Sequence, residues 1–270
     1  MKKFQVLLSI LKMDELSYID SLKITGDAVV VNQCDSDLIE NVIRRSVNGS
    51  DQAVKYVKTT GRGLSKSRNQ AIENADAEIC ILCDNDVVYE QDYEKLIIDE
   101  FEKRPDADII VFYIKRKEKT VPNYPVAKKM DYLSVLKIFS PEIAFRRERI
   151  SDLRFNEDFG AGSGKYIMGE ENIFLYDALK KKKNIYYVPI KIAELKEVES
   201  TWFSEYNEKF FISRGANYAA MSKTWSHVLI WQFALRKKNL YGDKMSMLKA
   251  IKTMYKGKRE FLSSQKISNC

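Results

Sequence analysis

Residues 61–86 have the sequence GRGLSKSRNQAIENADAEICILCDND, and this order of residue types indicates the fold. A basic turn comes first, a helix-like segment follows, and an apolar run, Ile79–Cys83, then ends abruptly in Asp84-Asn85-Asp86. Residues i and i+2 of an extended chain project to the same side, so Asp84 and Asp86 would lie close together and repel. A divalent cation would remove that repulsion. The alternative is that Asp84 caps the following turn while Asp86 is solvated.

The pattern around this stretch predicts an α/β protein. Short apolar runs alternate with helix-like segments, which favours βαβ units and a mostly parallel sheet whose ligands bind at the carboxyl ends of the strands. The strands of the first half are expected at Phe4–Leu11, Ala28–Val31, Val54–Val57, Glu78–Cys83 and Ala107–Ile114. The helices are expected near Asp14–Lys23, Asp37–Ser46, Ser65–Asn74 and Gln91–Lys103.

The second half changes character. A charged segment containing two prolines, Lys115–Lys129, predicts a loop, and three glycines between 160 and 164 break the structure before a helix that starts near Glu170. The remaining elements expected are a helix at Met130–Phe139 and strands at Glu142–Arg147 and Asn184–Ile190.

Composition narrows the class of protein. With 45% hydrophobic residues in 270, the chain can build a substantial core, and no apolar run is long enough for a membrane span. The segment after Met1 lacks a signal-peptide cleavage site, so we expect a cytoplasmic protein. One histidine and a single C-x-x-C argue against zinc. Ten basic residues against two acidic ones in Trp231–Cys270 account for the net charge of +7, so a general nucleic-acid-binding surface is not indicated.

Three pieces of the sequence together resemble the family 2 glycosyltransferases of the GT-A fold. They are VVVNQCD at 29–35, the stretch 61–86, and MGEENIFLYDAL at 168–179. The resemblance covers about residues 4–200. It implies a GT-A catalytic domain at 1–202, with a nucleotide-binding half at 1–115 and an acceptor-binding half at 116–202. The expected architecture is a mixed, mostly parallel sheet flanked by helices, followed by a helical, basic extension at 203–270.

The acidic turn would be the D-x-D motif of that family. The resemblance implies that Asp86 binds Mn²⁺ or Mg²⁺ directly, that Asp84 faces the ribose or shares the metal, and that Asn85 lies between them at the nucleotide site. Transfer from a nucleotide sugar expels a diphosphate, and a divalent cation stabilises its developing charge. Carboxylate oxygens are suitable hard ligands, with phosphate oxygens and water completing the coordination.

Five more residues are assigned to the nucleotide by the resemblance. Asp35 would hydrogen-bond the base, usually uracil, although it could equally cap the helix predicted to follow it. Ser9, at the end of the first strand, would line the base pocket, and Arg68 would lie near the nucleotide. Arg62 and Lys66 are candidates for binding the diphosphate, or simply solvated charges.

An inverting transfer needs a base that takes the proton of the acceptor hydroxyl. By the resemblance this carboxylate opens the helix after the glycine-rich loop, which places Glu171 on the base position and Glu170 beside it. Both could instead complement the helix dipole. His227 is expected on a helix surface or in a core, and Trp202 and Phe203 could either stack against a sugar or pack inside the protein.

The C-terminal segment has apolar residues at helical spacing with lysines between them. A basic amphipathic helix that binds an anionic membrane surface and a helix packed on the domain both remain open. The apolar positions are Met245, Leu248, Ile251, Met254 and Tyr255.

The leading hypothesis is an inverting, metal-dependent glycosyltransferase that uses a UDP-linked sugar. Its acceptor would be a glycan or lipid-linked glycan of a surface polysaccharide such as a capsule or O-antigen, made at the inner face of the cell membrane. Two alternatives remain. A sugar nucleotidyltransferase usually has a glycine-rich basic loop after its first strand, which Ser9–Met13 does not provide. A peripheral membrane protein with a degenerate GT-A fold would lack activity.

Overall fold

The computed structural model describes residues 3–13, 16–196 and 206–268. The chain forms two compact units. The first, here called the sheet unit, comprises residues 1–62, 66–154 and 178–198. The second, the helical unit, comprises residues 63–65, 155–177 and 199–270.

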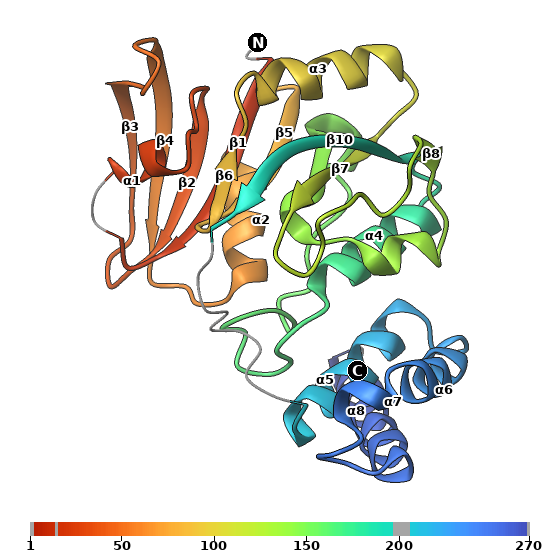
Figure 1. The fold of residues 1–270 in the computed structure, drawn as a ribbon. Coiled ribbons are helices and arrows are strands. Elements are labelled where there is room, and N and C mark those ends of the chain that lie inside the picture. The colour runs from red at the N-terminus through yellow and green to blue at the C-terminus, as the bar shows by residue number, and fades with distance from the viewer. Residues whose placement is uncertain (1–2, 14–15, 197–205, 269–270) are drawn as a thin grey trace. The chain divides into compact units, whose positions relative to one another are not determined.

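One sheet organises the sheet unit, and within the described residues it has ten strands (Figure 1). The strand order is β3-β4-β2-β1-β5-β9-β7-β10-β6, and β8 pairs with β10. The strands are β1 Phe4–Leu11, β2 Ala28–Gln33, β3 Leu38–Arg45, β4 Asp51–Thr59, β5 Ile79–Asp84, β6 Val87–Tyr89, β7 Ile109–Lys115, β8 Lys128–Lys129, β9 Ile143–Arg146 and β10 Ile185–Leu195. β1 runs parallel to both β2 and β5, and β2 runs parallel to β4.

The central strands are buried on both faces, as the continuous apolar runs of β1 and β5 require. Helix α3, Tyr93–Lys103, adds an apolar stripe to this core through Tyr93, Ile97 and Phe101, which recur every four residues. Phe4 of β1 meets the Tyr93 ring edge-on at 6.0 Å. The sequence therefore predicted the α/β class and the mostly parallel sheet correctly.

The prediction of a helix at Asp37–Ser46 is wrong. This segment is the edge strand β3, which pairs antiparallel with β4. Leu38 and Val42 have helical spacing, but β-branched residues prefer strands, and Asn48-Gly49 forms the turn of a β-hairpin. Gly49 has a φ of +81°, a conformation that glycine adopts without strain. Asp35 therefore caps no helix after β2.

Other differences concern short elements. The helix expected at Asp14–Lys23 is reduced to a single turn, and the one expected at Met130–Phe139 contains only a 3₁₀ turn. The acidic turn leads into a short strand, β6, and the last strand extends to Leu195. The remaining helices of the first 180 residues are α1 Tyr18–Ser21, α2 Leu64–Asn74, α4 Glu170–Lys180 and the 3₁₀ turns η1 Ser134–Lys137, η2 Ser140–Glu142 and η3 Arg147–Ile150.

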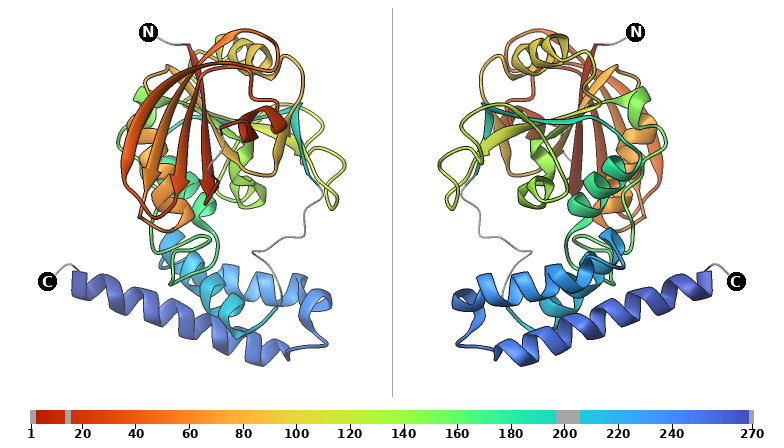
Figure 2. Two further views of the ribbon diagram at one scale, coloured as in Figure 1. Left: turned by 90° about the vertical axis from the view of Figure 1, so that its left-hand side faces the viewer. Right: turned by 90° about the vertical axis from the view of Figure 1, so that its right-hand side faces the viewer.

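Four helices follow in the helical unit: α5 Glu208–Met221, α6 Ser226–Arg236, α7 Lys238–Tyr241 and α8 Met247–Ser268. α8 packs along α5 and also contacts α6 (Figure 2). Close approach of α5 and α8 depends on two glycines, because a Cβ on Gly215 would overlap the Met254 carbonyl and one on Gly257 would overlap the Ile212 carbonyl.

The apolar positions of α8 are used in this packing. Ile251 and Met254 are buried, as is Phe261 about two turns further along the same helix, whereas Leu248 is exposed. The tail therefore contains a helix whose buried apolar side chains pack within its own unit. No helix among the described residues combines the length and the apolar character that crossing a bilayer demands.

Candidate active site

The carboxyl ends of the parallel strands β1, β2, β4 and β5 share one edge of the sheet, where a ligand site is expected. Ser9 of β1 is aligned with Asp84 of β5 and with Val31 of β2. The register therefore brings Ser9 next to the acidic turn. Ser9 Oγ also accepts a hydrogen bond of 2.9 Å from Ser67 Oγ at the start of α2.

Arg68 pairs with the first carboxylate of the turn. Its Nη2 donates to Asp84 Oδ1 at 2.9 Å and to Oδ2 at 3.1 Å. The Arg68 side chain is 2% exposed and that of Asp84 is 18% exposed, so solvent screens this ion pair little. An unpaired charge at this depth would be costly, so each member of the pair stabilises the other. Arg68 belongs to α2 and Asp84 ends β5, so the pair also links the helix to the carboxyl end of this strand.

Asp86 is in a different state. Burial, and next the negative charge of Asp84, raise the pKa of Asp86 to about 6, while the positive charge of Lys196 acts in the opposite direction. The turn itself is held by backbone contacts: Lys196 N–H donates to Asp86 O at 2.7 Å, and the Tyr18 hydroxyl donates to Asn85 O. Asn85 therefore contributes through its backbone to the shape of the turn.

The Asp86 carboxylate fits a divalent cation. Its Oδ1 is buried and has no hydrogen-bond partner among the described residues. A buried carboxylate oxygen without a partner is costly unless a proton or a cation neutralises it. Asp84 also has oxygen atoms of the right type, but both already accept hydrogen bonds from Arg68. The described residues contain no cluster of three or more His, Cys, Asp or Glu side chains that could hold a metal.

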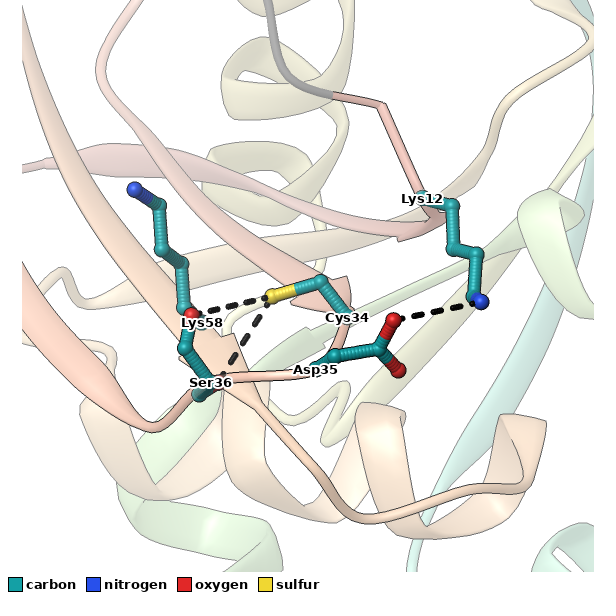
Figure 3. A pocket seen from close by; sticks show the side chains of 5 residues that line it. All are labelled: Lys12, Cys34, Asp35, Ser36 and Lys58. Carbon is teal, nitrogen blue, oxygen red and sulfur yellow. Dashed lines mark hydrogen bonds and ion pairs between the residues drawn. The ribbon is translucent and has the colours of Figure 1, made fainter.

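Asp35 lies at the carboxyl end of β2 beside an open pocket of about 340 Å³ (Figure 3). Hydrogen bonding and charge from Lys12, followed by the charge of Arg62, lower the pKa of Asp35. Lys12 Nζ lies 3.3 Å from Asp35 Oδ2, and Arg62 Nη2 lies 2.6 Å from Oδ1. The pocket is lined by Lys12, Cys34, Asp35, Ser36 and Lys58.

Arg62 is anchored as well as paired. Its Nη1 donates to Cys34 O at 2.8 Å and to two further backbone carbonyls, those of Thr59 and Thr60. The side chain thus fastens the loop after β4 to the end of β2. Lys66 is exposed at the start of α2, and its stem lies against Gly61, where a Cβ would come within 2.8 Å of Lys66 Cε.

The other predicted carboxylates belong to the helical unit. Glu170 is buried, and its carboxyl carbon would lie 3.1 Å from a Cβ on Gly160. Gly160 has a φ of +101°, a conformation that favours glycine, and its lack of a side chain lets Glu170 approach closely. Ser65 Oγ donates to Phe159 O at 2.7 Å, which ties the start of α2 to this loop. Glu171 is only partly buried.

The start of α4 is fixed by helix α5. Asn217 Nδ2 donates to Gly169 O at 2.7 Å, and Ser213 Oγ accepts from Ile167 N–H at 3.1 Å. Gly169 has a φ of +93°, and a Cβ there would overlap the Asn217 amide. Helix α5 therefore fixes the position of the start of α4, where Glu170 and Glu171 are the first two residues.

His227 has a packing role within the helical unit. Its Nδ1 lies 3.0 Å from the Tyr255 hydroxyl, and its Nε2 lies 2.7 Å from Lys258 Nζ, so it joins α6 to α8. This agrees with the expectation of a helix histidine. Trp202 and Phe203 lie outside the described residues.

Sequence reasoning missed several residues that shape these sites. Each of these residues contacts a partner that is distant in the sequence, so no local motif identifies it. The only signal was the position of Lys12, directly after the first predicted strand. The missed residues are Lys12, Tyr18, Ser67, Lys196, Ser213 and Asn217.

Comparison with known families identifies the chain. The model of Glycosyl transferase family 2 matches residues 26–168, which include the end of β2, the stretch 61–86 and the glycine-rich loop. The chain belongs to this family. This glycosyltransferase is therefore not a sugar nucleotidyltransferase. No curated protein sequence matches it significantly.

Solved structures show the same GT-A fold at low sequence identity. TarS 1–349 from S. aureus superposes with a TM-score of 0.58 at 15% identity, over 97% of this chain and 92% of that one. Its complex with UDP-GlcNAc gives 0.63 at 17% identity, over 96% and 80%. The mannosyltransferase PcManGT from Pyrobaculum calidifontis, in complex with GDP-Man and Mn²⁺, gives 0.52 at 14% identity, over 94% and 73%.

Proposed function

We propose that this glycosyltransferase is an inverting, metal-dependent enzyme that transfers a sugar from a UDP-linked donor to a hydroxyl of a glycan or lipid-linked glycan. The observation that carries the proposal is the partly buried carboxylate of Asp86, whose buried Oδ1 has no hydrogen-bond partner among the described residues and which lies just after the carboxyl end of β5. A cation at this position would satisfy that oxygen and offset the repulsion from Asp84.

The nucleotide would lie along the carboxyl edge of the sheet. Asp35 has a lowered pKa, is exposed and lines the 340 Å³ pocket, so its carboxylate can accept a hydrogen bond from an N–H group of the base. Uracil offers such a group in its N3–H. Lys12 and Lys58 add positive charge to the same pocket, which favours an anionic ligand. TarS 1–349 has been solved with UDP-GlcNAc, which is consistent with this donor class.

Asp86, and Asp84 to a lesser extent, would hold Mn²⁺ or Mg²⁺. When bound, the cation stabilises the negative charge that develops on the departing diphosphate. Arg68 pairs with Asp84 and orients its carboxylate, while Arg62 and Lys66 supply positive charge near the start of α2. PcManGT has been solved with a nucleotide sugar and Mn²⁺.

The acceptor hydroxyl would be activated by Glu171. As the hydroxyl oxygen bonds to the anomeric carbon, the bond to the diphosphate oxygen breaks and the hydroxyl proton passes to the carboxylate. Glu171 suits this role better than Glu170, because Glu170 is buried against the Gly160 loop and Glu171 is partly exposed. A base must reach its proton, so accessibility favours Glu171.

Isothermal titration tests the proposal directly. UDP should bind the wild-type protein roughly tenfold more tightly with Mn²⁺ than with EDTA, and Asp86→Ala should abolish that difference. GDP should bind more weakly than UDP, while Asp35→Ala should reduce that preference. A screen of nucleotide-sugar donors for release of free nucleotide then identifies the sugar. Metal-independent binding in the wild type, or full turnover by Asp86→Ala, would overturn the proposal.

A further inference from the structure

Helix α6 has apolar side chains on two opposite faces. One face is buried in the helical unit through Leu229, Ile230 and Ala234. The other face is exposed, and we call its side chains the α6 ridge. The α6 ridge consists of Trp225, Val228, Trp231 and Leu235, which are 63%, 54%, 46% and 59% exposed.

The spacing of the ridge shows that it is one surface. Its members follow one another at intervals of three, three and four residues, so their side chains project from the same side of the helix. Single exposed apolar residues are common, but a contiguous stripe with two tryptophans marks an interaction site. A helix with apolar side chains on two opposite faces normally has both faces covered, by protein or by lipid.

The chain segment that contains the ridge, residues 222–260, is positively charged. Helix α6 contains no acidic residue. Between residues 222 and 260 the exposed acidic side chains are Asp243 and Glu260. Exposed basic side chains are far more numerous in the same range: Lys223, Arg236, Lys237, Lys238, Lys244, Lys249, Lys252, Lys256 and Arg259.

This charge pattern distinguishes between possible partners. A second copy of the chain would bring the same positive surface to the interface, and like charges facing each other oppose association. An anionic bilayer offers the opposite charge, and each lysine or arginine near its surface adds to the attraction. Tryptophan is also enriched where membranes meet water, because its ring is apolar and its N–H group is polar.

We propose that the α6 ridge docks on an anionic lipid bilayer, with its four apolar side chains in the boundary between headgroups and acyl chains and with the neighbouring basic residues close to lipid phosphates. Ile251 and Met254 of α8 do not serve this purpose, since both are buried. The membrane contact that the sequence suggested for the basic tail is thereby assigned to α6.

Vesicle flotation of the full chain tests this assignment. Wild-type protein should float with phosphatidylcholine vesicles that contain about 30 mol % phosphatidylglycerol, and it should remain behind with pure phosphatidylcholine or at high salt. Trp225→Ser/Leu235→Ser should reduce partitioning roughly tenfold or more, because two of the four ridge side chains are lost. Lys238→Gln/Lys244→Gln should reduce it several-fold on anionic vesicles only.

A matched control removes exposed apolar residues elsewhere. Ile39 and Ile43 of β3 are 58% and 72% exposed, so Ile39→Ser/Ile43→Ser should float like the wild type. Far-ultraviolet circular dichroism and UDP titration verify that each variant is folded. Absence of wild-type flotation, or unchanged flotation of Trp225→Ser/Leu235→Ser, would overturn the proposal. So would a wild-type dimer that this variant dissociates while neither protein binds vesicles, since the ridge would then contact a second copy.

Discussion

Arg68 Nη2 donates hydrogen bonds to both carboxylate oxygens of Asp84, at 2.9 and 3.1 Å, and the arginine side chain is almost fully buried. The two aspartates of the acidic turn are thereby made different. Asp84 has a permanent positive partner, whereas Asp86 has an unpaired oxygen and a raised pKa. Asp86 is the carboxylate left available to bind a cation, while Asp84 stays in place next to Ser9.

Arg68→Ala should destabilise the sheet unit and weaken UDP binding together. Removing one member of a largely buried ion pair leaves the Asp84 charge uncompensated, which costs about 2–4 kcal/mol. The free energy of unfolding in urea measures this loss. The same charge would raise the pKa of Asp86 further, so titration calorimetry should show weaker Mn²⁺-dependent UDP binding at pH 7.

Two variants separate these effects from a general loss of stability. Arg44→Ala removes the partly buried Arg44–Asp20 ion pair, to which none of the proposed site residues belongs, and it should leave UDP affinity unchanged. Arg68→Ala/Asp84→Ala removes both charges and should recover part of the lost stability. If Arg68→Ala bound UDP and Mn²⁺ like the wild type, the role given to this pair would be wrong.

Asp86→Asn should stabilise the metal-free protein while abolishing metal-dependent UDP binding. The folded-state pKa of Asp86, about 6, lies above the ordinary value of 3.8, mainly because of burial. The protonated carboxyl group of Asp86 is the form that the folded state favours. Its stabilising contribution is therefore complete below pH 4 and is lost as the pH rises through about 6, where the charged form imposes a cost of burial. The amide removes that cost, so we expect a gain of about 1–2 kcal/mol at pH 7.5 in EDTA, after allowance for partial solvent exposure.

The same pKa sets the pH dependence of metal binding. Mn²⁺ must displace the proton from Asp86, so UDP affinity in Mn²⁺ should fall below pH 6 while affinity in EDTA stays nearly constant. Calorimetry at pH 5.5 and 7.5 measures the difference. Asp92→Asn, at an exposed position, serves as the control for stability. Equal unfolding free energies for Asp86→Asn and the wild type at pH 7.5 would contradict the assigned state of Asp86.

The sequence predicted the parts of this structure that depend on local pattern. The apolar runs of β1, β2 and β5 identified the central parallel strands, and the abrupt end of the run Ile79–Cys83 placed Asp84 and Asp86 at a strand end. Residues 38–45 were misassigned because the spacing of Leu38 and Val42 also fits a helix. The Asn48-Gly49 turn and the β-branched residues are the features that decide for a hairpin.

Contacts between distant segments could not be predicted in the same way. The pairing of Arg68 with Asp84 depends on how α2 packs over β5, and the position of Glu171 depends on Asn217 of α5 holding Gly169. Neither relationship has a local signature in the sequence. The resemblance to family 2 implied roles for the candidate site residues, but it carried no information on the helices that hold them.

Glu171→Gln and Glu170→Gln should affect different properties, the first catalysis and the second stability. If Glu171 is the base, Glu171→Gln should lower kcat by about 10²–10⁴-fold with little change in UDP affinity or melting temperature. Glu170 is buried beside Gly160, so Glu170→Gln should mainly lower the melting temperature. Steady-state kinetics with the identified donor, together with thermal unfolding, measure both. The reverse pattern would make Glu170 the base.

Gly257→Ala should weaken the packing of α8 on α5. A methyl group at this position would overlap the Ile212 carbonyl oxygen, which belongs to the α5 backbone and cannot rotate away, so the two helices must separate. We expect a loss of about 2–3 kcal/mol in the free energy of unfolding and faster amide exchange along α5. Because α5 holds the start of α4 through Asn217, kcat should fall too, although residue 257 belongs to none of the proposed binding sites.

The adjacent residue provides the matched control for this variant. Lys256 is exposed and forms a surface ion pair with Glu208, so Lys256→Ala should change stability by less than about 1 kcal/mol and leave kcat unaltered. Hydrogen exchange should then show protection of α5 reduced in Gly257→Ala and unchanged in Lys256→Ala. If the glycine variant lost stability but kept full kcat, the placement of Glu171 would not depend on the α5–α8 contact. The hydrogen bond from Asn217 to Gly169 would then be sufficient to hold the start of α4.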